Sequence, residues 1–459
     1  MNNVKRSLRD SSLIRWTVLL VLSLIMAANY FFYDVMSPLQ EQIRVHLHFS
    51  NTAYGFLQSA YSIPNVFLFM AIIGGIILDK IGIRITGFVF IAFMAVGSLL
   101  TAYGASDIFN NGGAGFHFFG SFMKSYSPSL KMMSFGFFLF GLGAETSIVV
   151  ISKIVVKWFK GKELAFALGI NLAIARFGTA LALAFSGTLS DIGPWTKPIW
   201  IGASMLCIGI LAFLLYIVFD IKIDRQVKSD LTASPEEEFK LSDVLKIIKI
   251  PSFIYIALLC VTFYSAVFPF LKYATDMMQN KFGLSGELSG KITSILPFGT
   301  ILFTPLFGLF TDLKGKSASV MILGSVLLIA VHLTFSFTNI TPYVPMFILG
   351  IAFSLVPAAM WPSVAKIVDT NKIGTAYGLM FSIQNFGLWL FTLLIGKVLD
   401  MSNKGITQDM ISQGKARLDY TNPILMLAFL GILGIIFAIL LKREDKKSGF
   451  GLELPNKVE

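Results

Sequence analysis

Long apolar stretches, separated by charged or turn-forming residues, dominate the pattern of this chain. About 20 consecutive apolar residues in a helix are enough to cross the hydrocarbon core of a bilayer, and twelve stretches reach that length. We therefore predict an all-α membrane protein with twelve transmembrane helices. The predicted spans are 13–36, 52–78, 86–105, 131–157, 162–187, 197–220, 251–275, 288–311, 318–337, 343–366, 374–397 and 422–441.

The twelve spans form two sets of six that repeat each other. One series of matches has a constant offset of 233 and pairs Gly75, Asp79 and Gly82 with Gly308, Asp312 and Gly315. A second series has an offset of 209 and pairs Phe138, Gly141, Lys157, Gly169, Phe177 and Gly178 with Phe347, Gly350, Lys366, Gly378, Phe386 and Gly387. Two pseudo-symmetric six-helix halves are typical of transporters whose substrate site lies between the halves.

The repeat predicts the domain boundaries. We expect an N-terminal half at 1–220, a linker at 221–250, a C-terminal half at 251–445 and a cytoplasmic tail at 446–459. Within the linker, Ser234-Pro235-Glu236-Glu237 has the form of a helix start. The apolar stripe Leu241, Val244, Leu245 and Ile248 then predicts an amphipathic helix on the cytoplasmic membrane surface, with a partner-binding helix as the alternative.

Composition and charge exclude several classes of protein. The chain of 459 residues is 55% hydrophobic and 14% charged, against roughly 25% charged residues in soluble domains, which excludes a soluble enzyme. Its net charge of +11 is the excess of 37 Lys and Arg over 26 Asp and Glu. With the termini placed in the cytoplasm, 25 of these bases lie in inside segments and 11 in outside segments. That excess follows the positive-inside rule and indicates topology, not a nucleic-acid partner. The sequence has no phosphate-binding glycine loop, zinc-ligand spacing or nucleophile triad, so we predict no enzyme and no cofactor.

The remaining base, Arg176, is predicted to be the only one buried within a span. It lies 14 residues after Lys162, or about 21 Å along a helix, and Glu145 lies 12 residues before Lys157, or about 18 Å. Both charges therefore fall near the middle of a core about 30 Å thick, where ionisable groups are functional candidates.

A central anion and a central cation together suit a zwitterion. Glu145 would receive its amino group, and Arg176 would hold its carboxylate through two hydrogen bonds. Two alternatives stay open: the charges neutralise each other as a structural pair, or Glu145 carries a coupling proton. At the offset of 209, the equivalent positions in the second half hold the neutral residues Ser354 and Asn385. Other polar and aromatic candidates for the same cavity are Tyr30, Tyr33, Gln58, Tyr61, Tyr264, Trp361, Gln384 and Asn385.

The two G-x-x-x-D-x-x-G loops, at 75–82 and 308–315, resemble the signature of the major facilitator superfamily. The resemblance implies that these loops latch the closed cytoplasmic gate, with Asp79 near the start of span eleven and Asp312 near the start of span five. Asp79, Gly82, Asp312 and Gly315 are therefore the predicted gating residues. An ordinary tight turn with a capping aspartate is the alternative.

A closer resemblance appears in FGLGAETS at 140–147, WFKGKELAFALG at 158–169 and NLAIARFG at 171–178. These stretches, with NYFFYDVMSPLQEQI at 29–43 and YSIPNVFL at 61–68, are similar to the lysosomal dipeptide transporter branch of the superfamily. That branch moves dipeptides by facilitated diffusion and prefers cationic ones. Its cargo-facing acidic and basic positions correspond to Glu145 and Arg176, so the resemblance implies a peptide cargo.

We therefore predict a secondary transporter that moves small peptides or related zwitterions by alternating access. A proton-coupled carrier of organic anions or drugs is the alternative within transport, and a membrane nutrient sensor is the alternative of another class. A composition rich in isoleucine, lysine and phenylalanine looks bacterial and predicts the cell inner membrane, with both termini cytoplasmic. The expected partners are the substrate, the lipid bilayer and protons as a candidate coupling ion, for a monomer or a homodimer.

Overall fold

The computed structural model describes residues 11–159, 161–227, 241–369 and 372–455, and their regular structure is helical. Within these ranges, eleven helices or helix pairs are long and apolar enough to cross a membrane, and one bent pair makes a twelfth candidate. These confirm the predicted spans. They are α1 (Ser12–Asp34), α3 to α5 (Asn51–Ser59, Ile63–Phe67 and Met70–Ile81), α6 (Ile83–Ala105), α9 (Pro128–Phe159), α10 (Leu164–Asp191), α11 (Lys197–Val227), α13 (Pro251–Phe282), α14 with α15 (Gly286–Thr293 and Ile295–Lys314), α16 (Ser317–Phe337), α17 (Tyr343–Ile367), α18 (Ile373–Ser402) and α20 (Thr421–Ser448).

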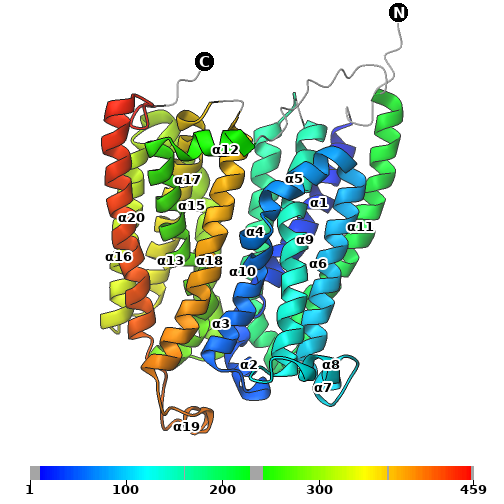
Figure 1. Cartoon of the computed structure of the whole chain (residues 1–459), viewed down its shortest axis with the longest axis vertical. Coiled ribbons are helices and arrows are strands. Elements are labelled where there is room, and N and C mark those ends of the chain that lie inside the picture. Colours follow the sequence, from blue (N-terminus) through cyan, green and yellow to red (C-terminus); the bar gives the residue numbers. More distant parts are fainter. Residues whose placement is uncertain (1–10, 160, 228–240, 370–371, 456–459) are drawn as a thin grey trace, which may run out of the picture.

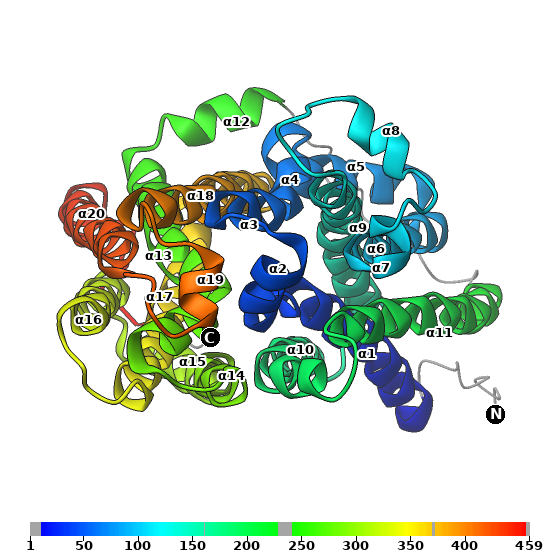
Figure 2. The same cartoon turned by 90° about the horizontal axis from the view of Figure 1, so that it is seen from below.

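The helices form two bundles that lie side by side. Figure 1 shows α1 to α11 in one bundle and α13 to α20 in the other, and Figure 2 shows the same division along the helix axes. Helix α1 begins and α20 ends on one face, which we call the terminal face (Figure 1). The opposite face, called the distal face, carries the short helices α2 (Gln40–Leu47), α7 (Asp107–Asn110), α8 (Phe116–Ser121) and α19 (Gln408–Ser412).

The repeated glycines mark where equivalent helices cross in the two halves. A Cβ on Gly178 would lie 2.1 Å from the carbonyl oxygen of Ala27, so α10 packs directly against the backbone of α1. A Cβ on Gly387, its partner in the repeat, would lie 2.1 Å from the hydroxyl oxygen of Ser265, where α18 crosses α13. Small residues allow such close approach of helices in membranes, so the glycine pattern in the sequence reports a real packing symmetry.

The second membrane-crossing element is broken. Helices α3 and α4, joined by the short 3-10 helix η3 (Ala60–Ser62), are bent by 58° from α5. The bend lies next to Phe69, whose φ of 51° is left-handed and ends the regular hydrogen-bond pattern. Before this bend, η3 packs against α9, which places Tyr61 beside that helix.

The linker between the halves contains α12 (Leu241–Ile248) on the terminal face (Figure 1). Ile247 is buried, whereas Leu245 and Ile248 are exposed beside Lys246 and Lys249. The expected helix start at Ser234 lies outside the described residues. The proposed contact with a membrane surface and the domain boundaries remain predictions.

The chain after α20 folds back onto the loop between α15 and α16. The backbone N–H of Ser317 donates to the carbonyl oxygen of Leu452 at 3.0 Å, and the Ser319 N–H donates to the Glu453 carboxylate at 2.9 Å. Burial raises the pKa of Glu453, but hydrogen bonds from Ser319 and the ammonium of Lys442 outweigh it and leave that pKa below its ordinary value of 4.5. We call residues 449–454 the tail clasp, because they close one end of the second half.

Candidate functional site

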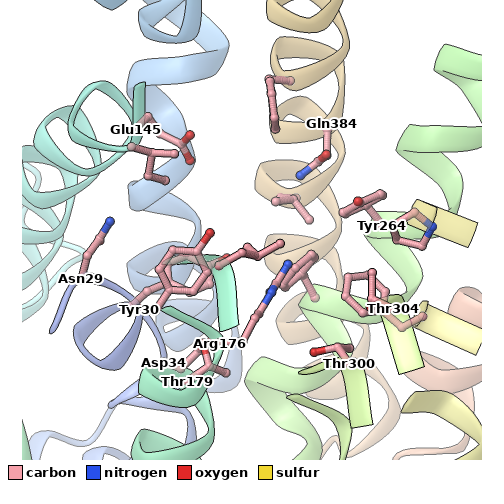
Figure 3. Close-up of a pocket in the computed structure, with 18 of the residues that line it drawn as sticks. Asn29, Tyr30, Asp34, Glu145, Arg176, Thr179, Tyr264, Thr300, Thr304 and Gln384 are labelled. Atoms are coloured by element: carbon pink, nitrogen blue, oxygen red, sulfur yellow. The ribbon is translucent and has the colours of Figure 1, made fainter. Parts of the chain in front are cut away.

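A cavity of about 530 Å³ lies between the two halves. The first half contributes residues of α1, η3, α5, α9 and α10, and the second half contributes residues of α13, α15, α17 and α18 (Figure 3). Nine of the ten residues predicted for the cavity line it, among them Tyr30, Tyr61, Glu145, Arg176, Tyr264, Trp361, Gln384 and Asn385. Tyr33 lines it as well, but Gln58 does not, since its amide donates to the hydroxyl of Tyr54 at 3.0 Å.

Glu145 is held by its neighbour from the broken element. The Tyr61 hydroxyl donates to the Glu145 carboxylate at 2.9 Å. This contact depends on Gly141, one turn before Glu145 on α9, because a Cβ there would lie 2.2 Å from the carbonyl oxygen of Tyr61. The glycine therefore lets η3 approach α9 and bring the phenol to the carboxylate.

Arg176 lies among aromatic rings. Its guanidinium carbon is 5.5 Å from the ring centre of Tyr30, 5.6 Å from Phe268 and 5.7 Å from Phe353. A cation at this distance is attracted by the electron-rich ring faces. Among the described residues no ion pair joins Arg176 to Glu145, so the alternative of a structural pair does not describe this conformation. Figure 3 shows the Arg176 side chain extending across the cavity and Glu145 on a separate helix.

The second half presents a wall of neutral groups. The indole N–H of Trp361 donates to the Tyr264 hydroxyl at 3.0 Å, and the Trp361 ring stacks on Phe381 with centres 4.7 Å apart. Asn385 donates its amide to the Phe381 carbonyl oxygen at 3.1 Å. Gln384 lies one residue earlier on α18 and faces the same cavity (Figure 3).

A buried ion pair closes the cavity toward the distal face. Lys272 of α13 lies 2.9 Å from Asp34 of α1, and both side chains are 3% exposed. The second carboxylate oxygen of Asp34 accepts a hydrogen bond from Thr179 at 2.8 Å. The prediction that Arg176 is the only base buried within a span is therefore wrong. Helix α13 extends to Phe282, and Lys272 faces the other half rather than water.

A second cluster joins the halves closer to the distal face. Arg44 of α2 forms an ion pair with Asp276 of α13 at 2.8 Å. The carboxylate of Asp400, at the end of α18, accepts the backbone N–H groups of Asn51 at 3.1 Å and Thr52 at 2.8 Å, at the start of α3. Sequence reasoning missed this cluster because its members lie near helix ends, where charged residues are ordinary.

The cavity extends in the other direction, toward the terminal face. Its lining includes Gly169, five residues after Leu164, where α10 begins. The structure is therefore closed on the distal side, and we call this the distal-closed conformation. Among the described residues no group of three His, Cys, Asp or Glu side chains is placed to hold a metal ion.

Comparison with known proteins identifies the family. The family model of the major facilitator superfamily matches residues 20–392 and 274–455. The chain belongs to the major facilitator superfamily. It is thus a multi-pass membrane protein and a secondary transporter, from a family of transporters rather than enzymes.

Individual relatives and solved structures agree with this assignment. The chain is 31% identical over 397 residues to the lysosomal dipeptide transporter MFSD1 of Homo sapiens, covering 84% of this chain and 80% of that protein. It is 30% identical over 401 residues to the same-named protein of Danio rerio, covering 84% and 81%. The solved nucleoside transporter NupG superimposes with a TM-score of 0.68 at 17% identity, covering 93% of this chain and 99% of that one. An inward-open structure of the xylose transporter XylE from E. coli gives 0.67 at 14% identity, covering 94% and 96%.

The signature loops of the superfamily lie on the terminal face. Gly82 and Gly315 have φ values of 87° and 68°, which a residue with a Cβ adopts only under strain. Asp79 forms an ion pair with Lys153 of its own half at 2.5 Å, and Asp312 is exposed. The latch role of these loops concerns a state closed on the terminal side, so for this distal-closed conformation it remains a prediction.

Proposed function

We propose that this protein carries dipeptides or related small zwitterions by alternating access, with Glu145 receiving the amino group and Arg176 the carboxylate. The observation that supports the proposal most directly is that both charges line one cavity without an ion pair between them. Each charge is thus placed to interact with a ligand that carries the opposite sign.

The size and surroundings of the cavity support a small polar cargo. A volume of about 530 Å³ falls within the range of small-molecule sites. A guanidinium can hold a carboxylate through two parallel hydrogen bonds while its flat faces stay against aromatic rings. The relatives named as dipeptide transporters support the same cargo class.

The excess of bases in the segments that join the spans on the terminal face favours a cytoplasmic terminal face, and the composition favours the cell inner membrane. Opening of the distal side then requires the two halves to separate at the Asp34–Lys272 pair and at the Arg44–Asp276 pair. The cavity would then be exposed to the two sides of the membrane in turn.

The test is thermal stabilisation of the purified protein by a dipeptide series, followed by uptake into proteoliposomes. Wild type is compared with Glu145→Gln, Arg176→Ala and the control Lys397→Ala, which removes an exposed base on α18. We expect concentration-dependent stabilisation of wild type and of the control, lost in both cavity variants. A protein that no dipeptide stabilises would contradict the proposal and direct the search to organic anions and drugs. Binding without uptake would favour a sensor, and uptake that requires a pH gradient would assign a coupling proton.

A further inference from the structure

The charged groups of the cavity all come from one half. Among the described lining residues, the carboxylates and bases are Asp34 on α1, Glu145 on α9 and Arg176 on α10. The described lining residues of α13, α15, α17 and α18 are all neutral. The internal repeat shows the same asymmetry, because Ser354 and Asn385 stand in the second half where the first has Glu145 and Arg176.

The neutral wall has a fixed shape. Trp361 is held at three points: its indole donates to Tyr264, its ring stacks on Phe381, and its carbonyl oxygen accepts the Tyr377 hydroxyl at 3.1 Å. Tyr264 in turn packs edge-on against Phe353, with ring centres 5.5 Å apart. Aromatic groups held in place in this way form a rigid contact surface that loses little conformational entropy when a ligand binds.

Gln384 adds a side-chain amide to this wall. Its side-chain oxygen accepts a weak hydrogen bond from the thiol of buried Cys260 at 3.8 Å, which anchors the amide on the second half. A neutral amide offers hydrogen bonds but no charge. A carboxylate pressed against it would lose its hydration without gaining a cation in return.

The other cations near the cavity are already assigned. Under the proposed function Arg176 holds the main-chain carboxylate, and Lys272 is paired with Asp34 behind the cavity. An acidic side chain on the substrate would therefore meet the neutral wall, with no unpaired cation among the described lining residues to receive it. An apolar or aromatic side chain would stack on the rings, and a cationic one would be attracted by the ring faces.

From this division of charge we infer that the wall formed by Trp361, Tyr264, Phe381 and Gln384 is the subsite for the substrate's side chains. The first half recognises the ends common to all dipeptides, and the second half selects among them and excludes acidic side chains. This inference rests on the proposed function, since it assumes that the main-chain charges of a peptide occupy Glu145 and Arg176.

Four homodipeptides test the inference because they share main-chain charges and differ only in side chains: diglycine, diphenylalanine, dilysine and diglutamate. Binding is measured by titration calorimetry on the full-length protein in detergent. For wild type we expect diglutamate to bind at least about tenfold more weakly than diphenylalanine. Trp361→Ala should weaken diphenylalanine and dilysine by roughly tenfold and leave diglycine within about twofold. Trp361→Phe, which keeps a ring, should restore most of the loss.

A second variant changes selectivity in the opposite direction and keeps the test decisive if Trp361→Ala does not fold. Gln384→Lys adds a cation to the wall and should strengthen diglutamate by roughly tenfold while weakening dilysine. Equal binding of diglutamate and diphenylalanine by wild type, or an equal loss for all four peptides in Trp361→Ala, would overturn the inference and leave the proposed function standing. Binding of none of the four, diglycine included, would overturn both.

Discussion

The buried pair between Asp34 and Lys272 is expected to hold the distal side closed. It joins α1 of one half to α13 of the other, and both side chains are 3% exposed. Replacing Lys272 by Met keeps most of the side-chain volume but leaves the Asp34 carboxylate buried and without its cation. Removing one partner of a buried pair costs about 3–5 kcal/mol.

That cost falls mainly on the distal-closed conformation, because separation of the halves would let water reach Asp34. The equilibrium between the two conformations should therefore shift toward the distal-open one. At the lower end of this range, about 3 kcal/mol, the equilibrium constant changes roughly 150-fold. In the double variant Asp34→Asn with Lys272→Met no unpaired charge is left buried at this position, so the shift should be much smaller.

The assay is the labelling rate of a cysteine placed at Ser37, in a background where Cys207 and Cys260 are replaced by serine. Ser37 is fully buried in the short 3-10 helix η2 (Ser37–Leu39), which packs against both α10 and α13. A maleimide reagent should therefore label it when the distal side opens, and Lys272→Met should accelerate labelling strongly.

Lys291→Ala serves as the control, because its partner Glu287 lies on the same helix and both side chains are about half exposed. It should leave the labelling rate unchanged. Unchanged labelling in Lys272→Met would refute the reasoning, as would a double variant that labels as fast as the single one.

Three further outcomes are expected. Gly178→Ala should lower the free energy of unfolding by about 1–3 kcal/mol because its Cβ meets the backbone of α1, whereas Gly169→Ala, with open space around it, should not lower thermal stability. Because the pKa of Glu453 is lowered in the folded protein, its carboxylate contributes its full stabilisation of the tail clasp above pH 4.5. This stabilisation is lost as the pH falls from 4.5 through the lowered pKa. A spin label on the clasp should thus become mobile in acid, and Glu453→Gln should make it mobile at pH 7; a clasp equally rigid in that variant would contradict this. Tyr61→Phe removes the hydrogen bond to Glu145 and should weaken peptide binding by roughly tenfold without loss of folding, so unchanged affinity would argue against a role for that contact.

Much of this architecture follows from the linear order of residues. Apolar stretches of membrane length determine the spans, because a backbone in lipid must satisfy its own hydrogen bonds as a helix. The constant offsets of glycine and aspartate reveal two halves. In the structure, Gly178 and Gly387 lie at equivalent helix crossings, where a side chain would not fit. The depth of Glu145 and Arg176 could be counted from flanking lysines, and both line the cavity.

Other features depend on how the halves meet. In the sequence, Lys272 is a base near the end of one apolar stretch, and Asp34 is a polar residue near the end of another. Only the packing of η2, the segment that follows α1, against α13 makes them a buried pair. The contact between Tyr61 and Glu145 likewise depends on the packing of η3 against α9, which local sequence does not reveal.

The membrane class, the spans, the repeat and the depth of the central charges can all be predicted from the order of residues, because hydrophobicity and helical rise act along the chain. Which charges pair across the halves, which wall of the cavity is neutral and which side is closed depend on the folded arrangement. Those properties arise from side chains far apart in sequence, whose mutual distance and exposure to water are set only when the two bundles pack together.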